Sequence, residues 1–242
     1  GVYQKLDKSM IPNFELLDPG LMKTVAQADP GNEHAAIYMW GTTGIGYNKA
    51  KIEEIAPDAP TDSWDMVFDP EIVKQFKGCG VEMLDAQGDM IPIALNYLGL
   101  DPNSHDEADL QKAQDLFMAI RPYIRTFNSS EYINDLANGD ACLVVGWSGD
   151  ILQARDRADE ADNGVEIAYT VPKEGALMWF DMLAIPTDAP HPENAHKFLN
   201  FLMDAQVAAN ITNYVWYANA NVAATPLVDP DITSDPGIYP TE

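Results

Sequence analysis

The sequence is poor in basic residues, and this shortage excludes several classes of partner. It has 14 Lys and Arg against 38 Asp and Glu, which gives a formal net charge of −24. Such an excess of negative charge repels the phosphates of nucleic acids and anionic lipid headgroups, so neither is an expected partner. The same acidity suits a solvated surface or a cleft for a cationic ligand, and bulk charge alone does not separate these two interpretations.

Long apolar runs and the common catalytic or phosphate motifs are also missing. No stretch of about 18 apolar residues occurs, so no segment is expected to cross a bilayer. The four histidines lack the spacing of metal ligands, no P-loop is present, and residues 146–149 are one residue short of a nucleophile elbow. The glycines of residues 41–46 have the wrong spacing for a dinucleotide site, and we interpret this segment as a turn. The sequence therefore predicts no catalytic residue, no metal and no cofactor.

Cysteine is scarce, with two residues in the chain. Cys79 precedes a strand-like segment at 81–84, and Cys142 lies within another at 141–145. Two free buried thiols are the simplest interpretation. Neighbouring strands could nevertheless bring the two residues within disulfide range, which would suit an oxidising compartment.

Helix and strand patterns alternate along the chain, which indicates an α/β fold. Residues 109–120 place apolar side chains on one face at helical spacing. Residues 131–138 form a second predicted helix, with Ser129 and Ser130 as candidate N-caps, and a buried strand at 141–145 follows. With 46% hydrophobic residues, the chain can bury the core of one large domain or of two lobes.

Two pairs of side chains could bind an organic cation. Trp147 and Asp150 follow the predicted strand at its carboxyl end, where ligands bind in open α/β sheets. Trp179 lies near Asp181 in an apolar run. A carboxylate accepts hydrogen bonds from an ammonium group, and an aromatic ring adds cation–π attraction of about 0.5–2 kcal/mol. Structural roles compete with binding: a helix N-cap for Asp150, core packing for Trp179, and an edge position for Asp181.

Four strings of residues, in one order along the chain, carry a family resemblance. They are YMW with TTGIGYN at 38–48, LNYLG with DPNS at 95–104, YINDLANGD at 132–140, and YANAN with AATPL at 217–227. Together they resemble the putrescine- and spermidine-binding proteins of bacterial ABC importers. The resemblance covers essentially the whole chain, and such long strings are more specific than a lone glycine motif.

The resemblance implies a periplasmic-binding-protein fold, in which two α/β lobes joined by crossing strands enclose the ligand. Lobe one would comprise residues 1–39 and 173–217, and lobe two residues 40–172 and 218–242. The family's first lobe begins earlier than this chain, and the family continues beyond it into a closing helix. We therefore expect the N-terminal part of lobe one and the C-terminal helix to be missing.

The resemblance also implies a set of ligand-binding residues. The family's cleft Trp and Asp in Gly-Trp-x-Gly-Asp fall on Trp147 and Asp150. Its aromatic residue and Asp before the crossing strand fall on Trp179 and Asp181, and its Tyr in Tyr-Ala-Asn-Ala-Asn falls on Tyr217. From the residues alone, Tyr217 would be aromatic core at the end of a helix.

One acidic position of the family is not kept. The family carries an acid shortly after Leu-Asp-Ala, and the simple register places Gly88 at that position. Asp89 and Asp85 are the candidates to replace it. Trp179 offers a longer stacking face than Phe, which favours spermidine over putrescine with both bound.

The function implied by the resemblance is that of a receptor and not of an enzyme. The protein would be a periplasmic monomer when intact, binding a polyamine and delivering it to the membrane subunits of an ABC importer. The alternatives are a receptor of the same fold for a sugar or another solute, an amine-processing enzyme, and a ligand sensor for a membrane receptor. Because an exported protein meets an oxidising compartment, a Cys79–Cys142 disulfide is also predicted.

Overall fold

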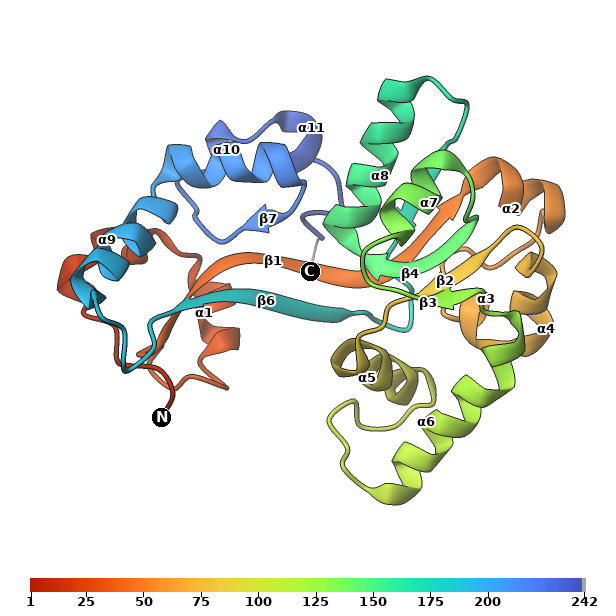
Figure 1. The fold of residues 1–242 in the computed structure, drawn as a ribbon, viewed down its shortest axis with the longest axis horizontal. Helices are drawn as coiled ribbons and strands as arrows, with labels where there is room; N and C mark the ends of the chain where they lie inside the picture. The colour runs from red at the N-terminus through yellow and green to blue at the C-terminus, as the bar shows by residue number, and fades with distance from the viewer. Residues whose placement is uncertain (241–242) are drawn as a thin grey trace. The chain divides into compact units, whose positions relative to one another are not determined.

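The computed structural model describes residues 1–240, which fold into two compact units (Figure 1). Unit 1 comprises Gly1–Gly41 and the chain from Trp179 onward, and unit 2 comprises Thr42–Met178. Two strands run from one unit into the other, β1 at Ala35–Asn48 and β6 at Leu177–Ala184, and they pair with each other. The chain therefore has the predicted α/β architecture with two lobes and crossing strands.

The division into units differs from the predicted lobes. The sequence prediction placed the boundaries after residues 39 and 172 and assigned 218–242 to the second lobe, whereas the structure packs 218–240 in unit 1. The reason is the short strand β7 (Ala218–Asn219). It pairs antiparallel with the N-terminal half of β1 and so fixes the following chain to unit 1.

Unit 2 contains a mixed sheet with the strand order β3, β2, β4, β1, β5. β2 (Val81–Met83) is parallel to β3 (Thr126–Phe127) and β4 (Leu143–Trp147), while β1 is antiparallel to β4 and β5 (Ile167–Thr170). β2 and most of β4 are buried, which is why the second predicted helix is followed by an unbroken apolar run and not by an alternating one.

The helices of unit 2 have ends set by local capping. The first predicted helix is confirmed as α6, which starts two residues earlier because the Asp106 side chain caps it. The second is confirmed as α7, but Ser129 and Ser130 do not cap it. The Asn128 side chain instead accepts hydrogen bonds from the two backbone N–H groups before the helix. The helical segments are α2 (Lys49–Ile55), α3 (Asp65–Phe68), α4 (Pro70–Val73), η3 (Lys74–Phe76), α5 (Gln87–Tyr97), α6 (Glu107–Ile120), η4 (Arg121–Tyr123), α7 (Tyr132–Asn138) and α8 (Ser148–Ala161).

The interpretation of residues 41–46 as a turn is wrong, because they lie in the middle of β1. Their glycines let neighbouring side chains approach the strand. A Cβ atom on Gly46 would lie 2.8 Å from the Ile151 side chain, and one on Gly44 would lie 2.6 Å from the Tyr169 hydroxyl. Close packing against α8 and β5 thus explains glycine inside a strand.

A disulfide and a buried ion pair reinforce unit 2. Cys79 and Cys142 are bonded, with their Cα atoms 5.5 Å apart, which confirms the predicted disulfide. The fully buried carboxylate of Glu82, on β2, is paired with the Arg125 guanidinium, which also bonds the Asp135 carboxylate at 3.1 Å. Burial raises the pKa of Glu82, and the charge of Arg125 opposes this rise.

Unit 1 joins the two ends of the described chain around a smaller core. Its helical segments are η1 (Lys8–Met10), η2 (Pro12–Leu16), α1 (Pro19–Val25), α9 (Pro192–Leu202), α10 (Ala205–Val215), η5 (Thr225–Leu227) and α11 (Pro230–Thr233). The buried His196 on α9 connects the ends, because its Nε2 accepts the backbone N–H of Asp7 at 2.9 Å. Across residues 1–240, every helix is too short or too polar to span a membrane.

Candidate functional site

The carboxylate of Asp89 is held by two side chains from neighbouring strands. Asp89 lies in the first turn of α5, and its Oδ2 accepts hydrogen bonds from Trp147 Nε1 at 2.7 Å and from the Thr43 hydroxyl at 3.1 Å. The two donors lie together because Thr43 pairs with Trp147 in the register of β1 and β4. Both donors use Oδ2, so within residues 1–240 the other oxygen, Oδ1, keeps its full capacity to accept from a ligand.

The carboxylate of Asp150 is held by a buried tyrosine. Asp150 lies in the first turn of α8, and its Oδ2 accepts a hydrogen bond from the Tyr132 hydroxyl at 2.8 Å. The same hydroxyl accepts the backbone N–H of Trp147 at 3.3 Å. The N-cap position of α8 is occupied by Trp147. Asp150 is therefore placed by a tertiary contact, and the capping role considered from the sequence is not the one observed.

The phenols near these acids remain protonated at neutral pH. Burial raises the pKa of Tyr132, and the negative charge of Asp150 raises it further. Burial also raises the pKa of Tyr169, whose hydroxyl contacts the Thr42 hydroxyl at 2.7 Å and donates to the Thr42 carbonyl at 3.0 Å. A protonated Tyr132 is a donor, so it stabilises the charged form of Asp150.

Asp85 and Gly88 lie outside this arrangement. Asp85 is exposed and forms no hydrogen bond or ion pair with residues 1–240. Gly88 is also exposed, with open space where a side chain would begin. Of the two acids considered as replacements at this position, Asp89 contacts the Trp147 indole and Asp85 does not.

In unit 1 the structure brings together Trp179, Tyr217 and Asp181. The rings of Trp179 and Tyr217 pack edge to face, with centroids 5.3 Å apart and planes at 69°. Asp181 lies two residues along β6 from Trp179, on the same face of the strand. Its side chain is exposed, and partial desolvation raises the pKa of its carboxyl. Burial raises the pKa of Tyr38 on β1, and the nearby charge of Asp181 adds to this rise.

Trp179 and Asp181 leave polar atoms unpaired on this strand. Within residues 1–240, the buried Nε1 of Trp179 donates to no acceptor, and the Asp181 carboxylate has no hydrogen bond or ion pair. A buried N–H without an acceptor costs about 1–3 kcal/mol. Unit 1 therefore presents a donor and an acceptor that its own residues do not satisfy.

Sequence reasoning missed Tyr132, Thr43 and Tyr38. Tyr132 opens one of the four strings that carry the family resemblance and lies in the predicted helix at 131–138, but nothing in the sequence linked it to Asp150. Thr43 acts through the pairing of β1 with β4, a register that a single sequence does not reveal. Tyr38 is close to Asp181 because β1 and β6 pair. The missing signal in all three cases was strand pairing or tertiary packing.

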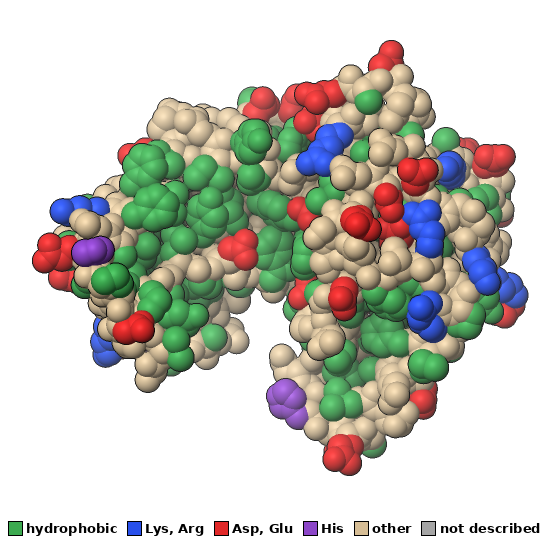
Figure 2. Space-filling view, viewed as in Figure 1, with side chains coloured by type: hydrophobic (Ala, Val, Ile, Leu, Met, Phe, Trp, Pro, Cys, Tyr) green, Lys and Arg blue, Asp and Glu red, His purple; other side chains and the backbone are tan. Residues whose placement is uncertain are grey.

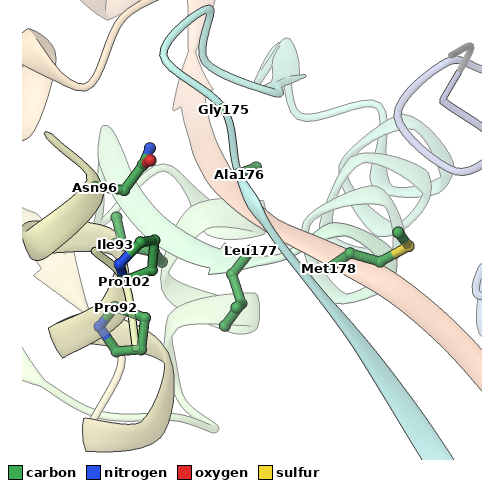
Figure 3. Close-up of a pocket in the computed structure, with 8 residues that line it drawn as sticks. All are labelled: Pro92, Ile93, Asn96, Pro102, Gly175, Ala176, Leu177 and Met178. Carbon is green, nitrogen blue, oxygen red and sulfur yellow. The ribbon is translucent and has the colours of Figure 1, made fainter. Parts of the chain in front are cut away.

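An apolar pocket of about 160 Å³ lies in unit 2 between α5 and the start of β6 (Figure 3). Leu177 points toward Pro92, whereas Met178 points away from α5. The polar lining side chain is Asn96, whose amide donates to the Glu174 carbonyl at 2.9 Å. No charged residue lines the pocket, so it does not fit an ammonium group.

Charged groups elsewhere are dispersed. On the face shown in Figure 2, Asp and Glu side chains are scattered among neutral ones and do not gather in a single patch. This distribution matches the solvated-surface interpretation of the net charge. Within residues 1–240, no group of three or more His, Cys, Asp or Glu is arranged to hold a metal ion.

Comparison with known sequences gives these observations a context. Residues 2–241 match the profile of a family described as bacterial extracellular solute-binding protein. The chain is 54% identical, over 100% of its length and 66% of the relative, to the putrescine-binding periplasmic protein SpuD of Pseudomonas aeruginosa (strain UCBPP-PA14). It is 51% identical, over 99% of its length and 65% of the relative, to the putrescine-binding periplasmic protein PotF of Escherichia coli (strain K12). The chain thus spans slightly less than two thirds of these relatives.

A solved structure agrees with the sequence matches. A spermidine/putrescine ABC transporter structure from Listeria monocytogenes superposes with a TM-score of 0.85 at 33% identity, over 99% of this chain and 69% of that one. The predicted resemblance and the predicted fold are confirmed. The predicted periplasmic location agrees with the family description and with the names of both relatives.

Proposed function

Because the chain belongs to the family of bacterial extracellular solute-binding proteins, we propose that it binds a linear polyamine, putrescine or spermidine, and delivers it to the membrane subunits of an ABC importer. One observation carries the proposal: aromatic rings lie beside carboxylates that have no basic partner. Asp89 contacts the Trp147 indole, Asp181 lies near Trp179, and neither acid forms an ion pair with Lys, Arg or His in residues 1–240.

This combination matches the chemistry of a polyamine. Each ammonium group needs acceptors that offset its desolvation, and a carboxylate supplies the strongest ones. The ring faces of Trp147 and Trp179 add cation–π attraction of about 0.5–2 kcal/mol. Methylenes lying on the rings contribute roughly 0.8 kcal/mol for each CH₂ removed from water. A neutral sugar donates hydroxyl hydrogen bonds to carboxylates but carries no positive charge to neutralise them.

The ligand groups are proposed in two sets, one in each unit. In unit 2, Trp147 supplies a ring, and Asp150 and Asp89 supply carboxylates. In unit 1, Trp179 and Tyr217 supply rings and Asp181 a carboxylate. Asp89 takes the role of the family acid that is absent at Gly88. Its Oδ2 accepts from the Trp147 indole and its Oδ1 remains able to accept from a ligand, whereas Asp85 does not contact the indole.

The remaining features of the proposed role follow from the kind of relative. The two curated relatives are named as binding proteins, which supports a receptor without catalysis. We further propose that the whole protein acts as a monomer. Both relatives are named for putrescine, whereas the structural relative at 33% identity is named for spermidine and putrescine, so both amines are candidates.

Isothermal titration calorimetry of the whole protein tests the proposal. Putrescine and spermidine should each release binding heat and be recovered unchanged by mass spectrometry. Saturable heat from a sugar in the absence of polyamine binding would favour a receptor for another solute. Formation of a product from either amine would show an enzyme and overturn the proposal.

Two matched variants test the choice of Asp89. Asp89→Asn should weaken polyamine binding by tenfold or more, because the substitution removes a charged acceptor beside Trp147. Asp85→Asn changes the same charge four residues earlier on an exposed site and should leave the affinity within twofold. The reverse ranking would place the replacing acid at Asp85.

A further inference from the structure

One buried hydroxyl contacts two of the residues proposed to bind the ligand. Tyr132, at the start of α7, is 1% exposed. Its hydroxyl donates to Asp150 Oδ2 at 2.8 Å and accepts the backbone N–H of Trp147 at 3.3 Å. The hydroxyl therefore connects the last residue of β4 with the first turn of α8. The hydroxyl donates its proton to the carboxylate, and one of its lone pairs accepts the backbone N–H.

The backbone around Tyr132 is shaped to admit its ring. Gly146 precedes Trp147 on β4, and a Cβ atom there would lie 2.6 Å from Tyr132 Cε2. Such a distance is far inside van der Waals contact, so the ring occupies the space that any other residue at 146 would need. The same Cβ atom would lie 3.2 Å from the Ile151 side chain. The glycine in Gly-Trp-x-Gly-Asp is thus explained by the position of Tyr132.

We infer that Tyr132 is a positioning residue for the polyamine site, which orients the Asp150 carboxylate and the Trp147 main chain through its single hydroxyl. The inference rests on the proposed function, because it assigns Tyr132 a role in the binding of that ligand through Asp150. Tyr132 itself is nearly inaccessible, so it acts through the two residues that it contacts and not on the ligand.

The chemistry of the contact supports an orienting role. A hydrogen bond from a neutral donor to a carboxylate is stronger than one between neutral groups, and it fixes which oxygen faces inward. Burial and the charge of Asp150 both raise the pKa of Tyr132, so the phenol keeps its proton throughout the neutral range. The titratable groups that act on Tyr132 are Asp150 from α8 and Tyr169 from β5, and both disfavour the phenolate.

The first experiment needs no ligand. Tyr132→Phe keeps the ring and removes the hydroxyl, so the ¹³C chemical shift of the Asp150 carboxyl group, measured by NMR at neutral pH, should change because the carboxylate loses a donor. Tyr97→Phe is the matched control, since the Tyr97 hydroxyl donates to Asp65 Oδ1 at the same 2.8 Å elsewhere in unit 2. It should change the carboxyl chemical shift of Asp65 and leave that of Asp150 unchanged. An unchanged Asp150 chemical shift in Tyr132→Phe would overturn the inference.

The second experiment measures coupling by calorimetry with putrescine. Tyr132→Phe should weaken binding by about tenfold, whereas Tyr97→Phe should leave it within twofold. In an Asp150→Asn background the further loss caused by Tyr132→Phe should fall below threefold, because the acceptor it orients is gone. Equal losses in both backgrounds would show a structural role and overturn the inference.

The two experiments separate failure of the inference from failure of the proposed function. A wild-type protein that binds no polyamine would overturn the function, while the carboxyl chemical shift of Asp150 would still decide whether Tyr132 orients the carboxylate. If Tyr132→Phe does not fold, Gly146→Ala provides a second variant, because its Cβ atom displaces the ring. It should also change the carboxyl chemical shift of Asp150, and an unchanged chemical shift there would count against the inference.

Discussion

The two units hold their proposed ligand groups in opposite ways. In unit 2, Asp89 is fixed by Trp147 and Thr43, and Asp150 is fixed by Tyr132. In unit 1, Asp181 has no hydrogen bond within residues 1–240, and its side chain is exposed. The carboxylates of Asp89 and Asp150 are therefore held by residues of unit 2, whereas the carboxylate of Asp181 has no such support among residues 1–240.

The difference extends to how each unit is built. Unit 2 has a disulfide, a buried ion pair and a sheet whose inner strands are almost wholly buried. Unit 1 has a smaller core, and the buried Nε1 of Trp179 finds no acceptor among residues 1–240. A rigid frame can hold side chains in binding geometry and so reduce the entropy lost on binding. Unit 2 should thus contribute a preorganised set of groups, and unit 1 a set that is satisfied by the ligand.

Removing the disulfide should produce the largest loss of stability, and it should be confined to unit 2. The bond closes a loop with a sequence separation of 63, which corresponds to about 4 kcal/mol in the chain-entropy account. Replacing Cys79 and Cys142 by Ala should lower the protection of β2 and β4 amides in hydrogen exchange. Peptides of α9 and α10 serve as the internal control. Equal loss of protection in both units would contradict the contrast between unit 1 and unit 2.

Removing Arg125 should produce the next largest effect. Arg125→Met leaves the buried Glu82 carboxylate without its cation, and we expect a loss of about 3 kcal/mol, because Arg125 is 40% exposed and its pair is partly screened. Lys112→Met is the control, since Lys112 pairs with Asp109 on the surface of the same unit. This substitution should lower the free energy of unfolding by less than about 1 kcal/mol. Urea unfolding followed by Trp fluorescence measures both. Equal losses would show that Glu82 is adequately solvated.

Neutralising Asp181 should weaken binding without weakening the fold. Asp181→Asn should reduce polyamine affinity by more than tenfold, because an ammonium group loses its charged acceptor in unit 1. The unfolding midpoint should not fall, since the carboxylate has no hydrogen bond or ion pair within residues 1–240 and its partial desolvation disfavours the charged form. Calorimetry and thermal unfolding measure the two quantities. Unchanged affinity would remove Asp181 from the proposed site.

The pH dependence of binding should identify the same residue. Partial desolvation raises the pKa of Asp181, so the folded protein favours its protonated form, and its contribution to stability is present in acid and is lost as the pH rises through the raised pKa. Binding has the opposite sign, because an ammonium group favours the carboxylate. Affinity should therefore fall as the pH drops through that same value, and Asp181→Asn should flatten this part of the profile.

The smallest predicted effect concerns the choice of amine. Trp179→Phe shortens the stacking face and should weaken the binding of spermidine by about fourfold, which corresponds to one methylene returned to water. The binding of putrescine should weaken by less. The variant also deletes the buried Nε1 that has no acceptor, so unit 1 should not lose stability through a broken hydrogen bond. Parallel calorimetric titrations of the wild type and the variant with both amines measure these changes in affinity. A wild type that prefers putrescine tenfold or more would refute the predicted preference for spermidine.

Much of the fold followed from local patterns, and the site followed from them only in part. Helices at 109–120 and 131–138 and a buried strand at 141–145, which the structure places at Leu143–Trp147, were recognisable from apolar spacing. The segment 41–46 was misjudged because its glycines serve side chains that approach from α8 and β5, which are distant in sequence. Local propensity cannot report such packing.

The candidate site shows the same limit. Trp147 and Asp150 stood out as a ring beside an acid, but the sequence favoured Asp150 as a helix cap. The observed partner, Tyr132, lies 18 residues earlier and contacts Asp150 only because α7 packs against α8. A composition of ring and carboxylate can be read from a sequence, whereas the hydrogen bonds that orient them depend on the assembled fold.

The chain order of the two units has a consequence for how the protein is made. Unit 2 is one continuous segment, Thr42–Met178, inserted between the two segments of unit 1. During synthesis all of unit 2 has been made before the second segment of unit 1. Contacts such as Asp7 with His196, 189 residues apart, must close a long loop, while most contacts of unit 2 close shorter ones. Unit 2 should therefore fold first and quickly. Once it has folded, the two segments of unit 1 are held closer together, and the loop between them costs less entropy to close.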